Sequence, residues 1–123
     1  MTYPELIIDC KDLNVPMKFL RSRDYVRLFI NSLIKDINMR KLGRLNLQYL
    51  NDPDEKLTGM SASQIIYTSS ITLHIYEYDD TLSLNVYSCR EFDDDKVVDC
   101  VRAFFNPAKI SVKRVMRGFN EDD

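Results

Sequence analysis

Two neighbouring stretches of the chain alternate strictly between apolar and polar side chains. In the first, Ile71, Leu73 and Ile75 alternate with Thr72, His74 and Tyr76; in the second, Leu82, Leu84 and Val86 alternate with Ser83, Asn85, Tyr87 and Cys89. Successive side chains of a β-strand point to opposite faces of its sheet, so the pattern predicts two strands with one apolar and one polar face. We expect helices to cover the apolar face.

The polar residues between these two strands predict a turn, and the turn sets the pairing register that we expect. A turn over residues 78–81 pairs Glu77 with Leu82, His74 with Asn85, and Ser70 with Cys89. This register places Cys89 beside Ser69. A preceding strand over residues 61–68 presents Ser61, Ser63, Ile65 and Tyr67 on one face, so the only histidine, a free thiol and several hydroxyls are expected to share a polar surface.

Patterns elsewhere complete the predicted fold. Apolar residues recur at helical spacing between Ser22, a suitable N-cap, and Gly43, and the acidic run 93–95 begins a second helix that ends before Pro107. Short apolar or alternating runs predict further strands at residues 5–10, 45–49 and 110–115. The result is an α+β fold, an antiparallel β-sheet with two helices packed on one face, in a single domain over residues 1–123.

Composition excludes several functional classes. The chain has 17 basic and 19 acidic residues and no basic cluster, which argues against binding to nucleic acid or to a membrane surface. No apolar run approaches the roughly 20 residues that cross a bilayer, and the first residues lack the pattern of a signal peptide, so we expect a cytoplasmic protein. The three cysteines lack CxxC spacing, so we expect free thiols and no metal site.

Each polar residue of this region, taken alone, has an ordinary structural explanation. A single strand histidine such as His74 usually hydrogen-bonds locally or faces solvent. An unpaired cysteine such as Cys89 usually acts as a small buried apolar residue. The pair Ser69 and Ser70 between two strands is most simply a turn, because hydroxyl groups bond nearby backbone atoms. Only the joint spacing of these residues is informative.

The segment from Gly59 to Cys89, GMSASQIIYTSSITLHIYEYDDTLSLNVYSC, resembles the bacterial and archaeal short form of S-adenosylmethionine decarboxylase. That family has a Gly-x-Ser strand, a processing turn before a serine, a strand ending in Thr-x-His, and a strand ending in a catalytic cysteine. Without a gap, the matching positions are Ser61, Ser69, Thr72, His74 and Cys89. The resemblance extends more weakly to the first strand, the acidic-start helix and the last strand.

The resemblance implies a proenzyme that cleaves itself between Thr68 and Ser69, with Ser69 becoming a covalently bound pyruvoyl group. Ser61 and His74 then assist cleavage, His74 as a base, a role that suits a group titrating near neutral pH. The pyruvoyl group forms a Schiff base with the substrate amine and accepts electrons during decarboxylation, and Cys89 returns a proton to the product. The implied substrate is S-adenosylmethionine, whose decarboxylated form serves spermidine biosynthesis, and the implied assembly is a homodimer.

Three positions depart from the family pattern. Thr68 replaces the family's glutamate at the cleavage bond, and Ser70 replaces a histidine. Tyr76 and Glu77, which we expect to bind substrate, stand in Tyr-Glu-Tyr where the family has Trp-Pro-Glu. Two alternatives therefore stay open: a pyruvoyl-dependent decarboxylase of another amino acid such as ornithine or arginine, and an uncleaved homologue that acts as a binding or regulatory partner.

Overall fold

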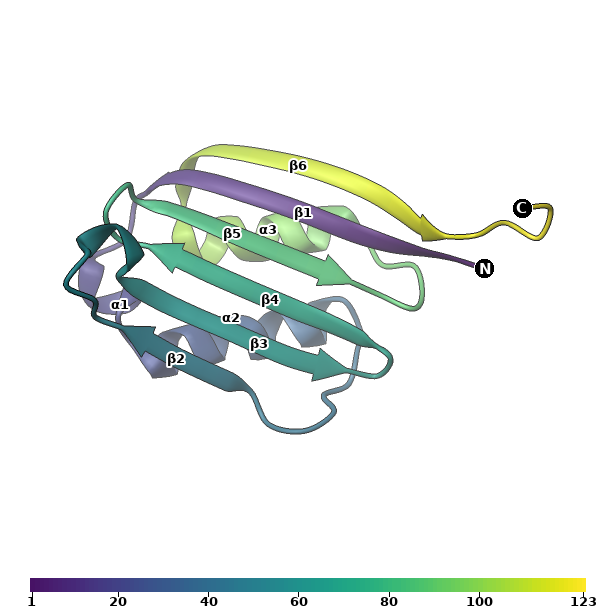
Figure 1. Ribbon diagram of the computed structural model, residues 1–123, viewed down its shortest axis with the longest axis horizontal. Helices are drawn as coiled ribbons and strands as arrows, with labels where there is room; N and C mark the ends of the chain where they lie inside the picture. Colours follow the sequence, from purple (N-terminus) through teal and green to yellow (C-terminus); the bar gives the residue numbers. More distant parts are fainter.

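The computed structural model describes residues 1–123 and contains one six-stranded antiparallel sheet (Figure 1). Its strands, in the order β2-β3-β4-β5-β1-β6, are β1 (Thr2–Leu13), β2 (Asn46–Leu50), β3 (Gly59–Ile66), β4 (Ser69–Tyr76), β5 (Thr81–Tyr87) and β6 (Pro107–Gly118). The predicted α+β class is confirmed, with strand ends displaced by one or more residues from those expected. The centre of the sheet is formed by β4 and β5, the two alternating strands.

Helices lie against one face of this sheet, behind it in the view of Figure 1. They are α1 (Met17–Leu20), α2 (Arg23–Asp36) and α3 (Asp94–Phe105), and a short 3-10 helix, η1 (Glu55–Leu57), precedes β3. The Ser22 hydroxyl accepts the N–H of Tyr25, and the Asp93 carboxylate accepts that of Asp95, so both predicted helix starts are confirmed. The sequence did not predict α1, which is too short to show a period. None of the helices has the length and apolar character that crossing a membrane requires.

The helix α2 ends earlier than the expected boundary at Gly43. Asn38 adopts a left-handed conformation with φ of 57°, its N–H bonds the carbonyl of Lys35, and the N–H of Met39 bonds the carbonyl of Ile34. These bonds satisfy the last carbonyl groups of the helix, which ends the helical pattern. Residues 40–42 then run beside β3, where Tyr67 N–H donates to the carbonyl of Arg40 and Leu42 N–H donates to that of Ile65.

The apolar face of the sheet packs against α2 and α3 as the alternation predicts. The buried side chains of the two central strands are Ile71, Leu73, Ile75, Leu82, Leu84 and Val86. Phe29 of α2 and Phe105 of α3 meet over this face with ring centroids 4.9 Å apart. The opposite face has no helix over it and keeps Thr72, His74, Ser83 and Asn85 half-buried. The sheet therefore has one covered face and one open face.

The register of β4 and β5 differs from the expected one by two residues. His74 pairs with Ser83 and Ser70 with Tyr87, because the turn spans residues 77–80 and Thr81 already belongs to β5. Asp80 stays in the turn: it has φ of 57°, and its carboxylate accepts the N–H of Leu13. A shift of two residues keeps every side chain on its predicted face, so the register was wrong and the faces were right.

Candidate active site

Ser69 is the first residue of β4, and only 5% of it is exposed. Its Oγ donates a hydrogen bond to the carbonyl oxygen of Tyr67 at 3.1 Å and accepts one from the backbone N–H of Cys89 at 2.8 Å. The predicted proximity of Ser69 and Cys89 is confirmed, although Cys89 lies beyond the paired part of β5. The hydroxyl is thereby held at the junction of two strand ends.

The turn before Ser69 consists of Tyr67 and Thr68, because Ile66 pairs directly with Ser69. Our prediction of a turn at Ser69 and Ser70 was wrong, since both residues belong to the β4 ladder. Thr68 has φ of 48°, in the left-handed region that a β-branched residue rarely adopts. Backbone strain therefore lies next to the bond between Thr68 and Ser69.

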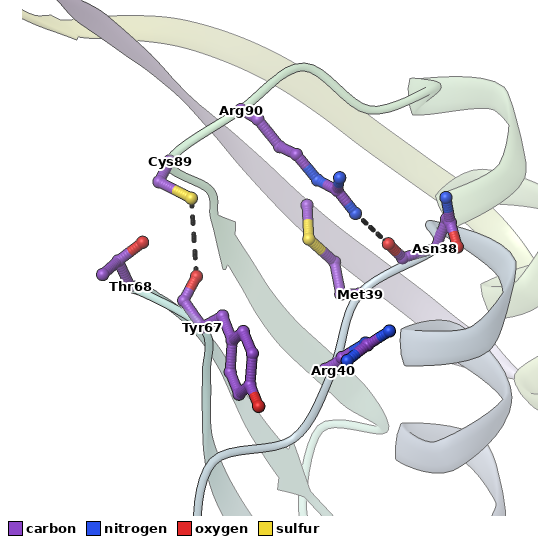
Figure 2. A pocket seen from close by; sticks show the side chains of 7 residues that line it. All are labelled: Asn38, Met39, Arg40, Tyr67, Thr68, Cys89 and Arg90. Carbon is purple, nitrogen blue, oxygen red and sulfur yellow. Dashed lines mark hydrogen bonds between the residues drawn. The ribbon is translucent and has the colours of Figure 1, made fainter.

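Cys89 lies between two cavities that meet at Thr68. Its Sγ donates to the carbonyl of Tyr67 at 3.4 Å (Figure 2). Hydrogen bonding by Thr68, and then by Ser69, lowers the pKa of the Cys89 thiol from its ordinary value. The cavity drawn in Figure 2 has a volume of about 500 Å³ and is lined by residues 38–40, Tyr67, Thr68, Cys89 and Arg90.

The second cavity, of about 520 Å³, is lined by Met1, Tyr3, Thr68, Tyr87 and Cys89. The rings of Tyr3 and Tyr87 have centroids 6.2 Å apart, so aromatic surface adjoins the strand end that carries Thr68 and Cys89. Sequence reasoning missed Tyr3, Arg40 and Arg90 as neighbours of Thr68. No local pattern points to them, because they come from three segments that only the fold brings together.

Ser61 and His74 form a second polar pair on the open face. They are direct cross-strand neighbours on β3 and β4, with Ser61 Oγ 2.7 Å from His74 Nδ1. Both line a small hollow of about 170 Å³ together with Thr72. The bond occupies Nδ1 and leaves the other imidazole nitrogen, Nε2, for a further partner.

The two pairs do not meet within one chain. His74 is five residues beyond Ser69 on the same strand, which corresponds to about 17 Å at the usual rise per residue. The buried Ser69 follows the alternation of the helix-covered face, whereas His74 lies on the open face. Ser69 therefore lies outside the polar surface that the alternation predicts around Ser61 and His74. Ser69 and His74 are five positions apart, an odd offset, so the pleat sends the two side chains to opposite faces.

Comparison with known proteins identifies the family. The sequence model of the S-adenosylmethionine decarboxylase family matches residues 4–118. The chain belongs to this family. The crystal structure of the adenosylmethionine decarboxylase from Aquifex aeolicus VF5 superposes with a TM-score of 0.78, at 16% identity, over 98% of this chain and 94% of that one. A comparison with curated proteins finds no match. Family and fold together indicate a decarboxylase, a lyase.

Tyr76 and Glu77, the two residues expected to bind substrate, point in different directions. Tyr76 lies on the open face with its ring 6.3 Å from that of His74. Glu77 turns away: its carboxylate accepts hydrogen bonds from Arg21 at 2.8 Å and from the Tyr49 hydroxyl at 2.7 Å. Burial raises the pKa of Glu77, but the hydrogen bonds from Arg21 and Tyr49 outweigh it and hold the pKa below its ordinary value. Glu77 is thus an ionised partner of Arg21.

Cys89 should react with iodoacetamide well before the other two cysteines of the uncleaved chain. Burial raises the pKa of Cys10 to about 11 and that of Cys100 to about 12, whereas the pKa of Cys89 is lowered. Because the thiolate is the nucleophile, we expect labelling of Cys89 at pH 8 to be more than about a hundredfold faster, measured by peptide mass mapping. Its rate should also stop rising at a lower pH than that of a free cysteine. Equal labelling of all three cysteines would contradict the lowered pKa of Cys89.

Proposed function

We propose that the chain is a self-processing, pyruvoyl-dependent S-adenosylmethionine decarboxylase whose product serves spermidine biosynthesis. One observation carries the proposal: the Ser69 hydroxyl is held by the Cys89 N–H at 2.8 Å, directly after a Thr68 in left-handed conformation. A fixed nucleophile beside a strained bond suits an intramolecular acyl shift. Membership of the decarboxylase family supports the same function.

Cleavage uses only groups of the chain. The Ser69 Oγ attacks the carbonyl carbon of Thr68 and its proton passes to the Ser69 nitrogen. The bond between that carbon and that nitrogen breaks, so an ester and a free amine replace the amide. Loss of the amide frees Thr68 from its left-handed conformation, so the strain favours the ester. Elimination from the ester then separates residues 1–68 from residues 69–123. The pyruvoyl group that Ser69 yields supplies an electron sink for the loss of carbon dioxide.

The remaining site residues have separate tasks in this proposal. Ser61 and His74 assist cleavage, with the Ser61 hydroxyl orienting the imidazole through Nδ1 and Nε2 taking the proton. Cys89 returns a proton to the decarboxylated product, and its position beside Ser69 supports that task. Tyr76 offers its ring to the substrate on the open face, where it is 37% exposed.

A homodimer reconciles the two separated pairs. We propose that the open face of each chain meets the strand end of its partner that carries Thr68, Ser69 and Cys89, so that Ser61 and His74 of one chain serve Ser69 and Cys89 of the other. The open face lacks a covering helix and exposes apolar surface at Ile65 (51%) and Tyr76 (37%), which a second chain would bury. Each complete site then draws on both chains.

A second candidate substrate is a smaller amino acid such as ornithine or arginine. The observation that favours it is the engagement of Glu77 by Arg21 and Tyr49, which withdraws the carboxylate from the face that carries Tyr76. Pyruvoyl chemistry and the cleavage site are the same in this alternative. Only the groups that recognise the rest of the substrate differ.

The intact mass of the purified protein tests the proposal. We expect two fragments, divided between Thr68 and Ser69, with the second blocked to Edman degradation by its keto group. Release of labelled carbon dioxide should then be fastest from S-adenosylmethionine, with ornithine and arginine as controls. A single uncleaved mass after prolonged incubation contradicts self-processing, and preferential release from ornithine or arginine contradicts the substrate.

A further inference from the structure

The cavity in Figure 2 brings positive charge to the cleavage turn. Thr68 and Cys89 are drawn on one side of it, and the guanidinium groups of Arg40 and Arg90 on the other. None of the seven lining residues is acidic. Two cations without an acidic partner make a cavity suited to a small anion, and a carboxylate is the anion whose geometry a guanidinium matches.

The two arginines are not equivalent. Arg90 donates a hydrogen bond to the carbonyl of Asn38, directly after α2, where helix carbonyl groups carry partial negative charge. The Arg40 side chain makes no hydrogen bond, ion pair or cation-π contact. Its backbone is nevertheless fixed, because its carbonyl accepts the N–H of Tyr67 at 3.1 Å. The Arg40 guanidinium is thus a cation without a partner, and its backbone is hydrogen-bonded to Tyr67, the residue before Thr68.

We propose that Arg40 binds the carboxylate that self-cleavage releases at Thr68, and that its charge accelerates the elimination step. This inference rests on the proposed self-processing function. In that step a base removes the Cα proton of residue 69, the electrons form a Cα–Cβ double bond, and the Cβ–O bond breaks. Its electron pair leaves on the carboxylate of Thr68. Water then hydrolyses the remaining enamine through its imine and releases ammonia.

The charge of Arg40 acts on elimination more than on ester formation. Ester formation places negative charge on the Thr68 oxygen only in its tetrahedral intermediate and ends with Thr68 neutral, whereas elimination leaves a full negative charge on Thr68. A cation placed where charge develops lowers the barrier of that step. After cleavage, the same ion pair holds the new chain end inside the cavity and away from the Cys89 thiol.

Three variants test the inference by the rate of cleavage and the amount of ester. Arg40→Gln removes the charge, Arg40→Lys keeps it, and Arg44→Gln removes a charge from the same connection outside the cavity. Because one hydrogen bond to a charged group is lost, we expect Arg40→Gln to cleave about tenfold more slowly than the wild type. Its ester should accumulate and yield a Thr68 hydroxamate with hydroxylamine. Arg40→Lys should retain most of the wild-type rate, and Arg44→Gln all of it.

Each outcome separates this inference from the function on which it rests. An uncleaved wild-type chain overturns both. Wild-type cleavage with an unchanged rate in Arg40→Gln overturns the role of Arg40 alone. Slow cleavage without accumulated ester also overturns it, because Arg40 would then act on the attack of Ser69 or on folding. Matching thermal unfolding midpoints of the wild type and Arg40→Gln exclude a general loss of structure.

Discussion

Replacing Ser69 with alanine is expected to leave the chain uncleaved, with no fragments above background after any incubation. In the proposed reaction the hydroxyl attacks the Thr68 carbonyl, and no other side chain takes its place in the bond with the Cys89 N–H. The loss should therefore be complete, unlike the partial effect expected for Arg40→Gln. Intact mass measured over a time course, beside the wild type, provides the test.

Ser70→Ala is the matched control for this change. Ser70 is the neighbouring strand residue, carries the same hydroxyl, and points to the opposite face from Ser69. Cleavage in Ser70→Ala should stay close to the wild-type rate. Fragments ending at Thr68 in the Ser69→Ala protein would refute the assignment of Ser69. Loss of cleavage in both variants would indicate damage to the strand end in place of a missing nucleophile.

Mixing two inactive variants is expected to restore cleavage. Ser69→Ala chains lack the nucleophile and His74→Ala chains lack the base, so neither is cleaved by itself. In a mixed dimer one site combines Ser69 of the His74→Ala chain with His74 of the Ser69→Ala chain, and that site is complete. Co-expression with different tags, followed by mass analysis, should show that only the His74→Ala chain is cut.

A mixture of His74→Ala with Ser61→Ala chains supplies the control for this experiment. Ser61 and His74 lie 2.7 Å apart in the same chain and belong to the same half of each site. A dimer of His74→Ala with Ser61→Ala therefore has one defect in each site and should stay uncleaved. Cleavage in this control would contradict sites shared between chains. So would a lack of cleavage in the first mixture when mixed dimers are present.

Much of the fold follows from local sequence patterns. The alternation from Ile71 to Val86 predicts which side chains are buried, because a strand's period of two depends only on backbone geometry. The start of α2 at Ser22 and that of α3 at Asp93 are also local, since a capping side chain bonds backbone only two or three residues ahead. Gapless spacing in the segment from Gly59 to Cys89 likewise indicated the family without a structure.

The candidate site depended on contacts between distant segments. The carboxylate of Asp80 bonds Leu13 and keeps the turn one residue earlier than predicted, which decides the register of β5. Thr68 adopts its left-handed conformation because Ile66 pairs with Ser69, which leaves only Tyr67 and Thr68 in the turn. The sequence predicted the turn at Ser69 and Ser70 instead, because serine favours turns.

The sequence by itself determined the covered and open faces, the capped helices and the group of residues that we propose as the site. Only the tertiary structure decided that Ser69 with Cys89 and Ser61 with His74 form two separate pairs, and that Arg40 lines the same cavity as Thr68. The physical reason is range. Periodicity and capping act between residues a few positions apart, whereas these neighbours meet through pairing and packing of segments far apart in the chain.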